Sequence, residues 1–109
     1  MGKGQLLGEF EICVLLAVAR LDGHAYGIRV SQQIEARTGR RISLGAVYST
    51  LSRLEDKGLV TATLSAPKPV QGGRARKCYR LTPSGCRALD ESLGMLRRMM
   101  AGWRPETAR

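Results

Sequence analysis

The chain has 109 residues, enough for one small domain with a modest core and too few for two. Lys and Arg number 18 against 9 Asp and Glu, so the net charge is +9, which favours a polyanionic partner such as nucleic acid or an acidic membrane surface. The longest apolar run, residues 12–19, is far shorter than the roughly 18 residues of a membrane span, and the chain does not begin with a signal-peptide pattern. We therefore expect a cytoplasmic protein without a membrane partner.

Two helices are predicted in the first third of the chain. The first spans residues 6–21, and because its apolar residues cover most of its sides, it should be buried. The segment "LDGHAYG" interrupts it, and a second helix follows over residues 25–38. Tyr26, Val30 and Ile34 form the apolar stripe of this second helix, and Gly39 ends it.

A third helix is predicted over residues 44–57, with Ser43 as its N-terminal cap and Gly58 as its end. Val47, Leu51 and Leu54 share one face, which must be buried. A helix-turn-helix whose second helix presents small and polar groups is typical of proteins that read the major groove, although an ordinary solvated face gives the same pattern. The candidate DNA-contacting residues of this helix are Ser43, Gly45, Tyr48, Ser49, Ser52 and Arg53.

A basic hairpin follows the third helix. Residues 59–65 and 77–82 alternate like strands, and the prolines and glycines between them indicate an exposed loop. Residues 66–80 contain five Lys and Arg and no acid, which is typical of a wing that follows a phosphate backbone. A solvated charge run is the alternative for this hairpin taken alone. Its candidate DNA contacts are Arg74, Arg76 and Lys77.

A fourth helix is predicted from Thr82, its cap, through Pro83 to Trp103. Its apolar residues from Cys86 onward are spaced 3, 4, 3, 4 and 3, which is the heptad seam of a coiled coil, while packing on the chain's own first helix would give the same stripe. The predicted homodimer interface comprises Leu89, Leu93, Leu96, Met100 and Trp103. Met95, Met99, Met100 and Trp103 also suggest a place for an apolar or aromatic effector, although such a methionine stripe is more often core.

The sequence does not favour an enzyme. The single histidine, His24, lies in a predicted turn without a nucleophile, paired carboxylates or a phosphate-binding loop nearby. Cys13, Cys78 and Cys86 lack CxxC spacing, which argues against a disulfide framework and a zinc site, so we expect reduced thiols, with redox sensing left open. No metal or cofactor is predicted.

Three segments, "HAYGIRV", "GAVYSTLSRLEDKGLV" and "GGRARKCYRLTPSG", resemble the PadR family of bacterial winged-helix transcriptional regulators over residues 6–93. Leu44 stands where that family commonly has proline, and Ala25 where it usually has glycine. The resemblance implies a homodimeric repressor with Tyr48 and its neighbours at the DNA and the hairpin as its wing. It also implies the short form of the family, with a single C-terminal helix.

The predicted fold is mainly α with a small β-hairpin: a winged helix-turn-helix over residues 1–81 and a C-terminal dimerisation helix and tail over residues 82–109. The predicted function is sequence-specific DNA binding by a transcriptional repressor. It would bind a palindromic operator as a homodimer, and release by a small-molecule effector is left open. The alternative is a winged-helix module that docks an acidic protein partner, since a fold does not settle a function.

Overall fold

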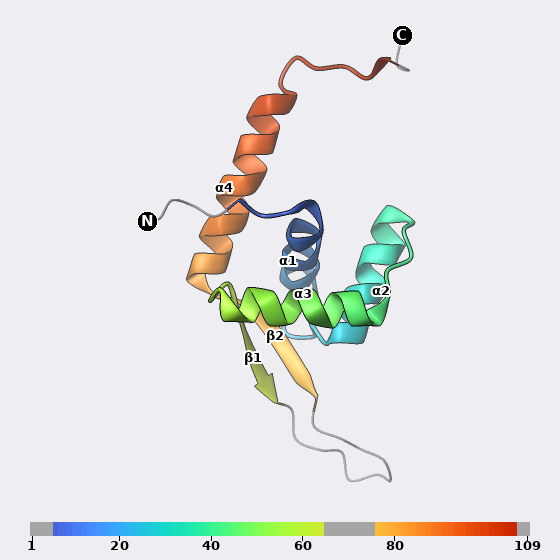
Figure 1. Ribbon diagram of the computed structural model, residues 1–109, viewed down its shortest axis with the longest axis vertical. Coiled ribbons are helices and arrows are strands. Elements are labelled where there is room, and N and C mark those ends of the chain that lie inside the picture. The colour runs from blue at the N-terminus through green and yellow to red at the C-terminus, as the bar shows by residue number, and fades with distance from the viewer. Residues whose placement is uncertain (1–5, 65–75, 107–109) are drawn as a thin grey trace.

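The computed structural model describes residues 6–64 and 76–106. It confirms a mainly helical chain with one two-stranded antiparallel hairpin (Figure 1). No helix in these two ranges is both long enough and apolar enough to cross a membrane. The elements in chain order are α1 (Glu9–Leu21), α2 (Gly27–Thr38), α3 (Leu44–Asp56), β1 (Val60–Leu64), β2 (Lys77–Leu81) and α4 (Pro83–Met100).

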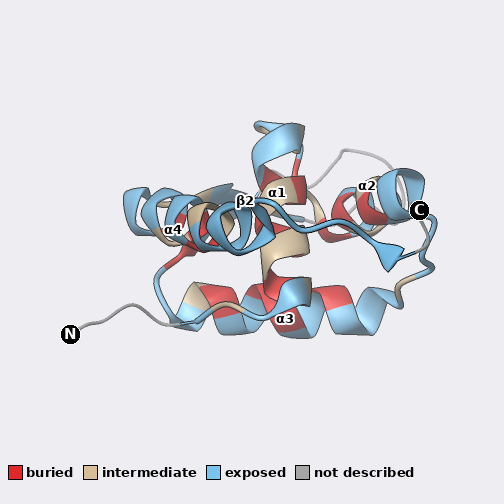
Figure 2. Cartoon of the chain, turned by 90° about the horizontal axis from the view of Figure 1, so that it is seen from above, coloured by how far each residue is buried: buried red, intermediate tan, exposed pale blue. Residues whose placement is uncertain are grey.

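Helix α1 is the centre of the fold, because α2, α3, β2 and α4 all pack against it. Val14, Leu15, Ala17 and Val18 are buried on it, as expected for a helix that is apolar on most sides (Figure 2). The predicted start at residue 6 was three residues too early. Gly8 is extended and its backbone N–H donates to Glu11 Oε1 at 2.9 Å, so the helix begins at the next residue.

Helices α2 and α3 form the predicted helix-turn-helix. The predicted start of α2 at residue 25 was wrong, because Tyr26 is extended and pairs with Cys78 in an isolated β-bridge. Gly39, in the left-handed conformation at φ 74°, ends α2 as predicted. In α3 the Ser43 hydroxyl accepts a hydrogen bond from the Ala46 N–H at 3.1 Å, which confirms the predicted cap. The predicted buried face of α3 is fully inaccessible at Val47, Leu51 and Leu54.

The hairpin is attached to the body of the protein by its second strand. Val60 lies opposite Leu81 and Ala62 opposite Tyr79 in the antiparallel register. Tyr79 is buried, and its N–H donates to the carbonyl of Ala25 at 3.0 Å. Burial raises the pKa of the Tyr79 hydroxyl, and the nearby Glu55 carboxylate adds to that rise. The hairpin is therefore joined to the residues that lead into α2.

Helix α4 begins as predicted and ends earlier. The Thr82 hydroxyl accepts from the Gly85 N–H at 3.0 Å and donates to the Gly58 carbonyl at 2.7 Å, so this cap joins α4 to the end of α3. The helix stops at Met100, and Gly102 follows in the left-handed conformation at φ 81°. The prediction that one helix extends to Trp103 was therefore wrong. The C-terminal half of α4 projects from the body (Figure 1).

Candidate nucleic-acid interface

The outer face of α3 is small, polar and open to solvent. Gly45, Ser49 and Ser52 are exposed, and nothing lies within 4 Å of the point where Gly45 would carry a Cβ. These three residues are opposite the buried stripe of the same helix, as predicted from their spacing. Short side chains on an exposed helix allow its backbone to approach a large surface closely, and the hydroxyls can bond phosphates or base edges.

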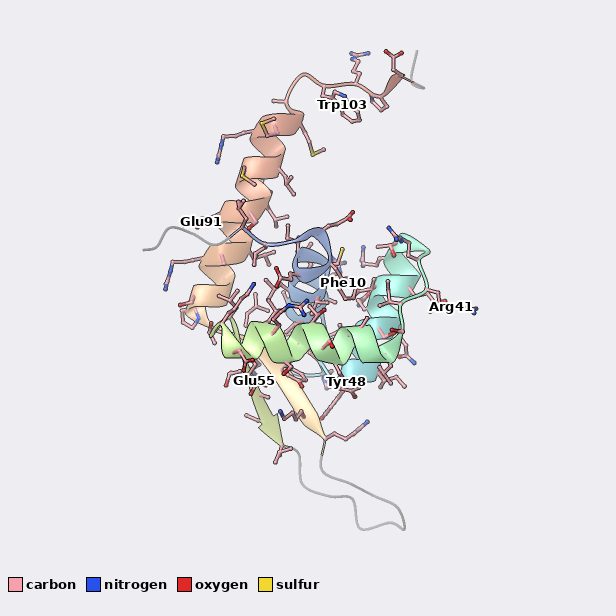
Figure 3. The ribbon with its side chains drawn as sticks, viewed as in Figure 1. Phe10, Arg41, Tyr48, Glu55, Glu91 and Trp103 are labelled. Carbon is pink, nitrogen blue, oxygen red and sulfur yellow. The ribbon has the colours of Figure 1, made fainter. Side chains whose placement is uncertain are left out.

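Tyr48 lies on the same helix with 46% of its surface exposed (Figure 3). Its ring rests against Gly27, the first residue of α2, and a Cβ at Gly27 would overlap the ring and hydroxyl of Tyr48. The absence of a side chain at Gly27 therefore makes the space that Tyr48 occupies. Tyr48 consequently has one side held by the protein and the other available to a ligand.

Arg53 lies nearer α1 than the other predicted contacts. Its Nε is 3.7 Å from Glu11 Oε2, and its Nη2 donates to the Thr50 hydroxyl at 3.4 Å. Lys57 Nζ is 2.9 Å from the same Glu11 oxygen. Arg53 remains 56% exposed, so its guanidinium is accessible to a phosphate as well as paired with Glu11.

Burial acts to raise the pKa of Glu11, but hydrogen bonds from Lys57 and from the Gly8 N–H, with the positive charges of Lys57 and Arg53, outweigh it. The net effect holds the pKa of Glu11 below its ordinary value of 4.5. Glu11 is therefore an anion at neutral pH and joins α1 to the end of α3. Glu11 lies in the first turn of α1 with Glu9, where acidic residues are common, so its place in the sequence did not mark it as the partner of Lys57.

Two of the predicted wing contacts, Arg76 and Lys77, lie at the end of the paired strands next to the loop. The Arg76 guanidinium carbon is 4.3 Å from the centroid of the Tyr26 ring, a cation–π contact. Lys77 Nζ is 3.6 Å from Glu55 Oε1, which connects β2 to α3. The third predicted wing contact, Arg74, lies outside the described residues.

The predicted dimer residues divide into two groups along α4. Leu89 is only 8% exposed and belongs to the chain's own core, and Leu93 packs against that core while partly buried. Further along, Leu96 is 41% exposed and Met100 58%. Trp103 is 64% exposed and lies beyond the end of the helix (Figure 3). Two residues of the predicted dimer interface, Leu89 and Leu93, therefore pack within their own chain.

One cavity lies far from this C-terminal group in sequence. It has a volume of about 430 Å³ between α1, the end of α2 and the turn into α3, with Phe10, Cys13, Ile34 and Ile42 among its lining residues. None of the predicted effector contacts, Met95, Met99, Met100 and Trp103, is among them. Within the described ranges no cluster of three or more His, Cys, Asp or Glu residues could hold a metal ion.

A helix-turn-helix with an open polar face on its second helix, followed by an antiparallel hairpin, is the arrangement of winged-helix proteins. Residues 15–91 match the transcriptional regulator PadR-like family, and the chain belongs to that family. This membership makes the protein a DNA-binding transcriptional regulator and not an enzyme.

Relatives and solved structures agree with this assignment. The chain is 40% identical over 90 residues to transcriptional regulator Rv3488 of Mycobacterium tuberculosis, covering 80% of this chain and 79% of that protein. A PadR-like transcriptional regulator from Bacillus cereus has a similar structure, with a TM-score of 0.65 and 27% identity over 84% of this chain and 87% of that chain. A transcriptional regulator from Clostridium thermocellum shares the fold, with a TM-score of 0.68 and 22% identity over 84% and 85% of the two chains.

Proposed function

We propose that this regulator is a repressor that binds a palindromic operator as a homodimer, with α3 in the major groove. The observation that carries the proposal is the open face of α3 at Gly45, Ser49 and Ser52, together with a hairpin that carries Arg76 and Lys77 at its loop end. A protein that acts on a bacterial chromosome acts in the cytoplasm, and this is the compartment we propose.

The residues of α3 have different proposed roles, which follow from their chemistry. Ser49 and Ser52 donate or accept hydrogen bonds at base edges, while Gly45 lets the start of the helix approach the groove. Tyr48 contacts base or backbone with the exposed part of its ring. Ser43, whose hydroxyl already caps the helix, contributes by fixing the first turn, where helix-turn-helix proteins read bases.

The wing supplies backbone contacts. Arg76 and Lys77 lie at the loop end of the hairpin, where Lys77 pairs with Leu64, and Arg74 precedes them in the sequence. Arg53 adds a cation on the α1 side of α3, held there by Glu11. Contacts of this kind fix the register on DNA and give affinity that falls with salt, whereas discrimination between sequences comes from α3.

The homodimer is proposed from the part of α4 that the chain's own core does not cover. Leu96 and Met100 on α4, and Trp103 just beyond its end, are exposed apolar groups, whereas soluble monomers seldom leave a contiguous apolar surface open. A second copy that covers this surface would bring two α3 helices to half-sites about 34 Å apart. Leu89 and Leu93 then hold α4 against the core of its own chain. The division of the chain into two parts at residue 82 stays a prediction.

A small-molecule effector is part of the same proposal. An apolar or aromatic compound would bind beside Met95, Met99, Met100 and Trp103, because methionine side chains repack readily around varied shapes. Trp103 is the single tryptophan of the chain, so its fluorescence reports on this place directly. Emission that stays unchanged across a panel of planar cations and phenols would contradict an effector site here.

Ser49→Glu tests the DNA-binding face, because a carboxylate there repels phosphates and cannot donate a hydrogen bond. The probe is a duplex selected by the wild-type protein from a random-sequence pool. We expect a loss of about 1–3 kcal/mol in binding free energy in a mobility-shift titration, with an unchanged circular dichroism spectrum. Gln32→Glu, at an exposed site on α2, makes the same change in charge and should bind like the wild type. Equal affinities of Ser49→Glu and Gln32→Glu would overturn the proposed contact.

The alternative of a module that docks an acidic protein makes a different prediction. Such a partner would need the basic surface and not the small residues of α3, so both acidic variants would weaken its binding alike. Selection from the random pool would then yield no preferred sequence.

A further inference from the structure

We infer that two adjacent residues at the start of α2, Tyr26 and Gly27, are positioning residues that together place the two DNA-contacting parts of the protein. Gly27 places Tyr48 on α3, and Tyr26 places Arg76 at the start of β2. This inference rests on the proposed function, because it assigns Tyr48 and Arg76 to the DNA.

Gly27 acts on Tyr48 through the space that its missing side chain leaves. A Cβ at this residue would overlap three atoms at the far end of the Tyr48 side chain, including the hydroxyl oxygen. The ring therefore packs directly on the α2 backbone, and nearly half of the residue remains exposed. Gly27 has an ordinary backbone conformation, since it is absent from the glycines with positive φ, so a turn does not explain a glycine here.

Tyr26 acts on Arg76 through its ring. The guanidinium carbon of Arg76 lies 4.3 Å from the ring centroid, which is within the range of a cation–π contact. Tyr26 also pairs with Cys78 in an antiparallel bridge. Cys78 follows Arg76 by two residues in the sequence. The ring thus lies beside the residue that precedes β2, and it limits where the Arg76 charge can go.

The backbone that carries this pair is held firmly. The Ala25 carbonyl accepts from the Tyr79 N–H at 3.0 Å, and the Tyr26 carbonyl accepts from the Val30 N–H at 2.9 Å. Ala25 is fully buried. One short, well-bonded segment consequently contacts both α3 and the hairpin, so their relative placement is set at the start of α2.

The first experiment uses Gly27→Ala, alone and combined with Tyr48→Ala, on the duplex selected by the wild-type protein. Alanine is a good residue for the first turn of a helix, so the fold should persist, but its methyl group displaces the Tyr48 ring. We expect Gly27→Ala to lower affinity about tenfold in the native background. In the Tyr48→Ala background the same change should alter affinity less than about twofold, because the ring it displaces is gone.

The second experiment separates the ring of Tyr26 from its hydroxyl. Tyr26→Phe keeps the aromatic face for Arg76 and should bind the duplex as the wild type does, whereas Tyr26→Leu should weaken binding about fivefold. In an Arg76→Gln background Tyr26→Leu should have little further effect. Circular dichroism and thermal melting of every variant check that the fold is retained.

The outcomes distinguish the inference from the proposed function. A selection that yields no preferred duplex overturns the proposed function and, with it, this inference, which assigns Tyr48 and Arg76 to the DNA. If a preferred duplex is found but Gly27→Ala weakens binding equally with and without Tyr48, the residue acts through general stability and the inference is wrong. The same holds for Tyr26 if its leucine and phenylalanine variants bind alike.

Discussion

At the scale of single residues, the pairing of Glu11 with Lys57 joins the central helix to the end of α3. The Glu11 side chain is only 11% exposed, and its 2.9 Å contact with Lys57 spans 46 residues of sequence. Arg53, more than half exposed, adds less because water screens its charge. Burial of an unpaired carboxylate would destabilise the folded protein, so the ion pairs favour the arrangement in which the end of α3 lies against Glu11 of α1.

The pH dependence of the free energy of unfolding of Glu11→Gln tests whether the Glu11 carboxylate stabilises the fold. Because the folded protein holds the pKa of Glu11 below 4.5, the carboxylate stabilises the fold above that pH, and the effect is lost as pH falls through the lower folded value. We expect Glu11→Gln to lower the free energy of unfolding by about 1–3 kcal/mol at pH 7, with the difference shrinking as the solution is made more acidic than pH 4.

Glu9→Gln is the matched control, since Glu9 is exposed two residues earlier on the same helix. Its unfolding free energy should stay within about 0.5 kcal/mol of the wild type in urea denaturation. A difference between wild type and Glu11→Gln that stays constant from pH 7 down to pH 3 would show that the carboxylate is not the stabilising group.

At the scale of elements, α4 contains two glycines with opposite surroundings. A Cβ at Gly85 would overlap the backbone carbonyl of Leu59, which cannot move without shifting β1. A Cβ at Gly94 would meet only the end of the Arg98 side chain, at 3.4 Å. The first glycine is therefore required by the close packing of α4 on the chain, and the second is not.

Replacing each glycine by alanine should change stability in opposite directions. Gly85→Ala forces a backbone shift and should destabilise the fold by about 1–3 kcal/mol. Gly94→Ala gains helix propensity without a clash and should stabilise it by about 0.5–1 kcal/mol. Thermal melting of the two variants measures this, and a stable Gly85→Ala protein would show that α4 does not pack closely on Leu59.

The elements themselves could be predicted from the sequence because their signals are local. The caps at Ser43 and Thr82 and the buried stripe of α3 depend on residues a few positions apart, and the structure confirms each of them. The start of α2 could not be predicted in this way. Tyr26 is at helical spacing from Val30, but a bridge to Cys78 holds it extended, and that bridge is formed across the fold.

The same limit applies to the candidate interface. The polar face of α3 follows from helical spacing alone, so its exposed residues were identified correctly as exposed. The contact of Arg53 with Glu11 and that of Tyr48 with Gly27 join separate helices. Spacing within one element cannot reveal such contacts, which is why Glu11, Tyr26 and Gly27 were not among the predicted site residues.

At the scale of the whole molecule, the apolar stripe of α4 has a buried half and an exposed half. Its first half, at Leu89 and Leu93, packs on the body of the same chain, while its second half leaves Leu96, Met99 and Met100 exposed on a projecting helix (Figure 1). A charge at Leu93 would disturb the core as well as any dimer, so it cannot distinguish the two roles. Leu96 is the better site.

Leu96→Asp should leave each chain folded and separate the proposed dimer. Two-fold symmetry would bring two uncompensated carboxylates to one apolar contact, at a cost of several kcal/mol. We expect sedimentation equilibrium to give a dimer for the wild type and a monomer for the variant, with matching circular dichroism. Affinity for a palindromic duplex should fall toward the level of a single half-site, because two linked half-sites bind far more tightly than one.

Arg98→Gln is the control for charge, because it lowers the net charge by the same amount on a different side of α4. It should remain a dimer and lose only the small affinity that one fewer positive charge implies. If the wild type sediments as a monomer, or if monomeric Leu96→Asp binds the duplex as tightly as the dimer, the exposed end of α4 has another purpose. Dimer formation would then not be the source of tight binding to the operator.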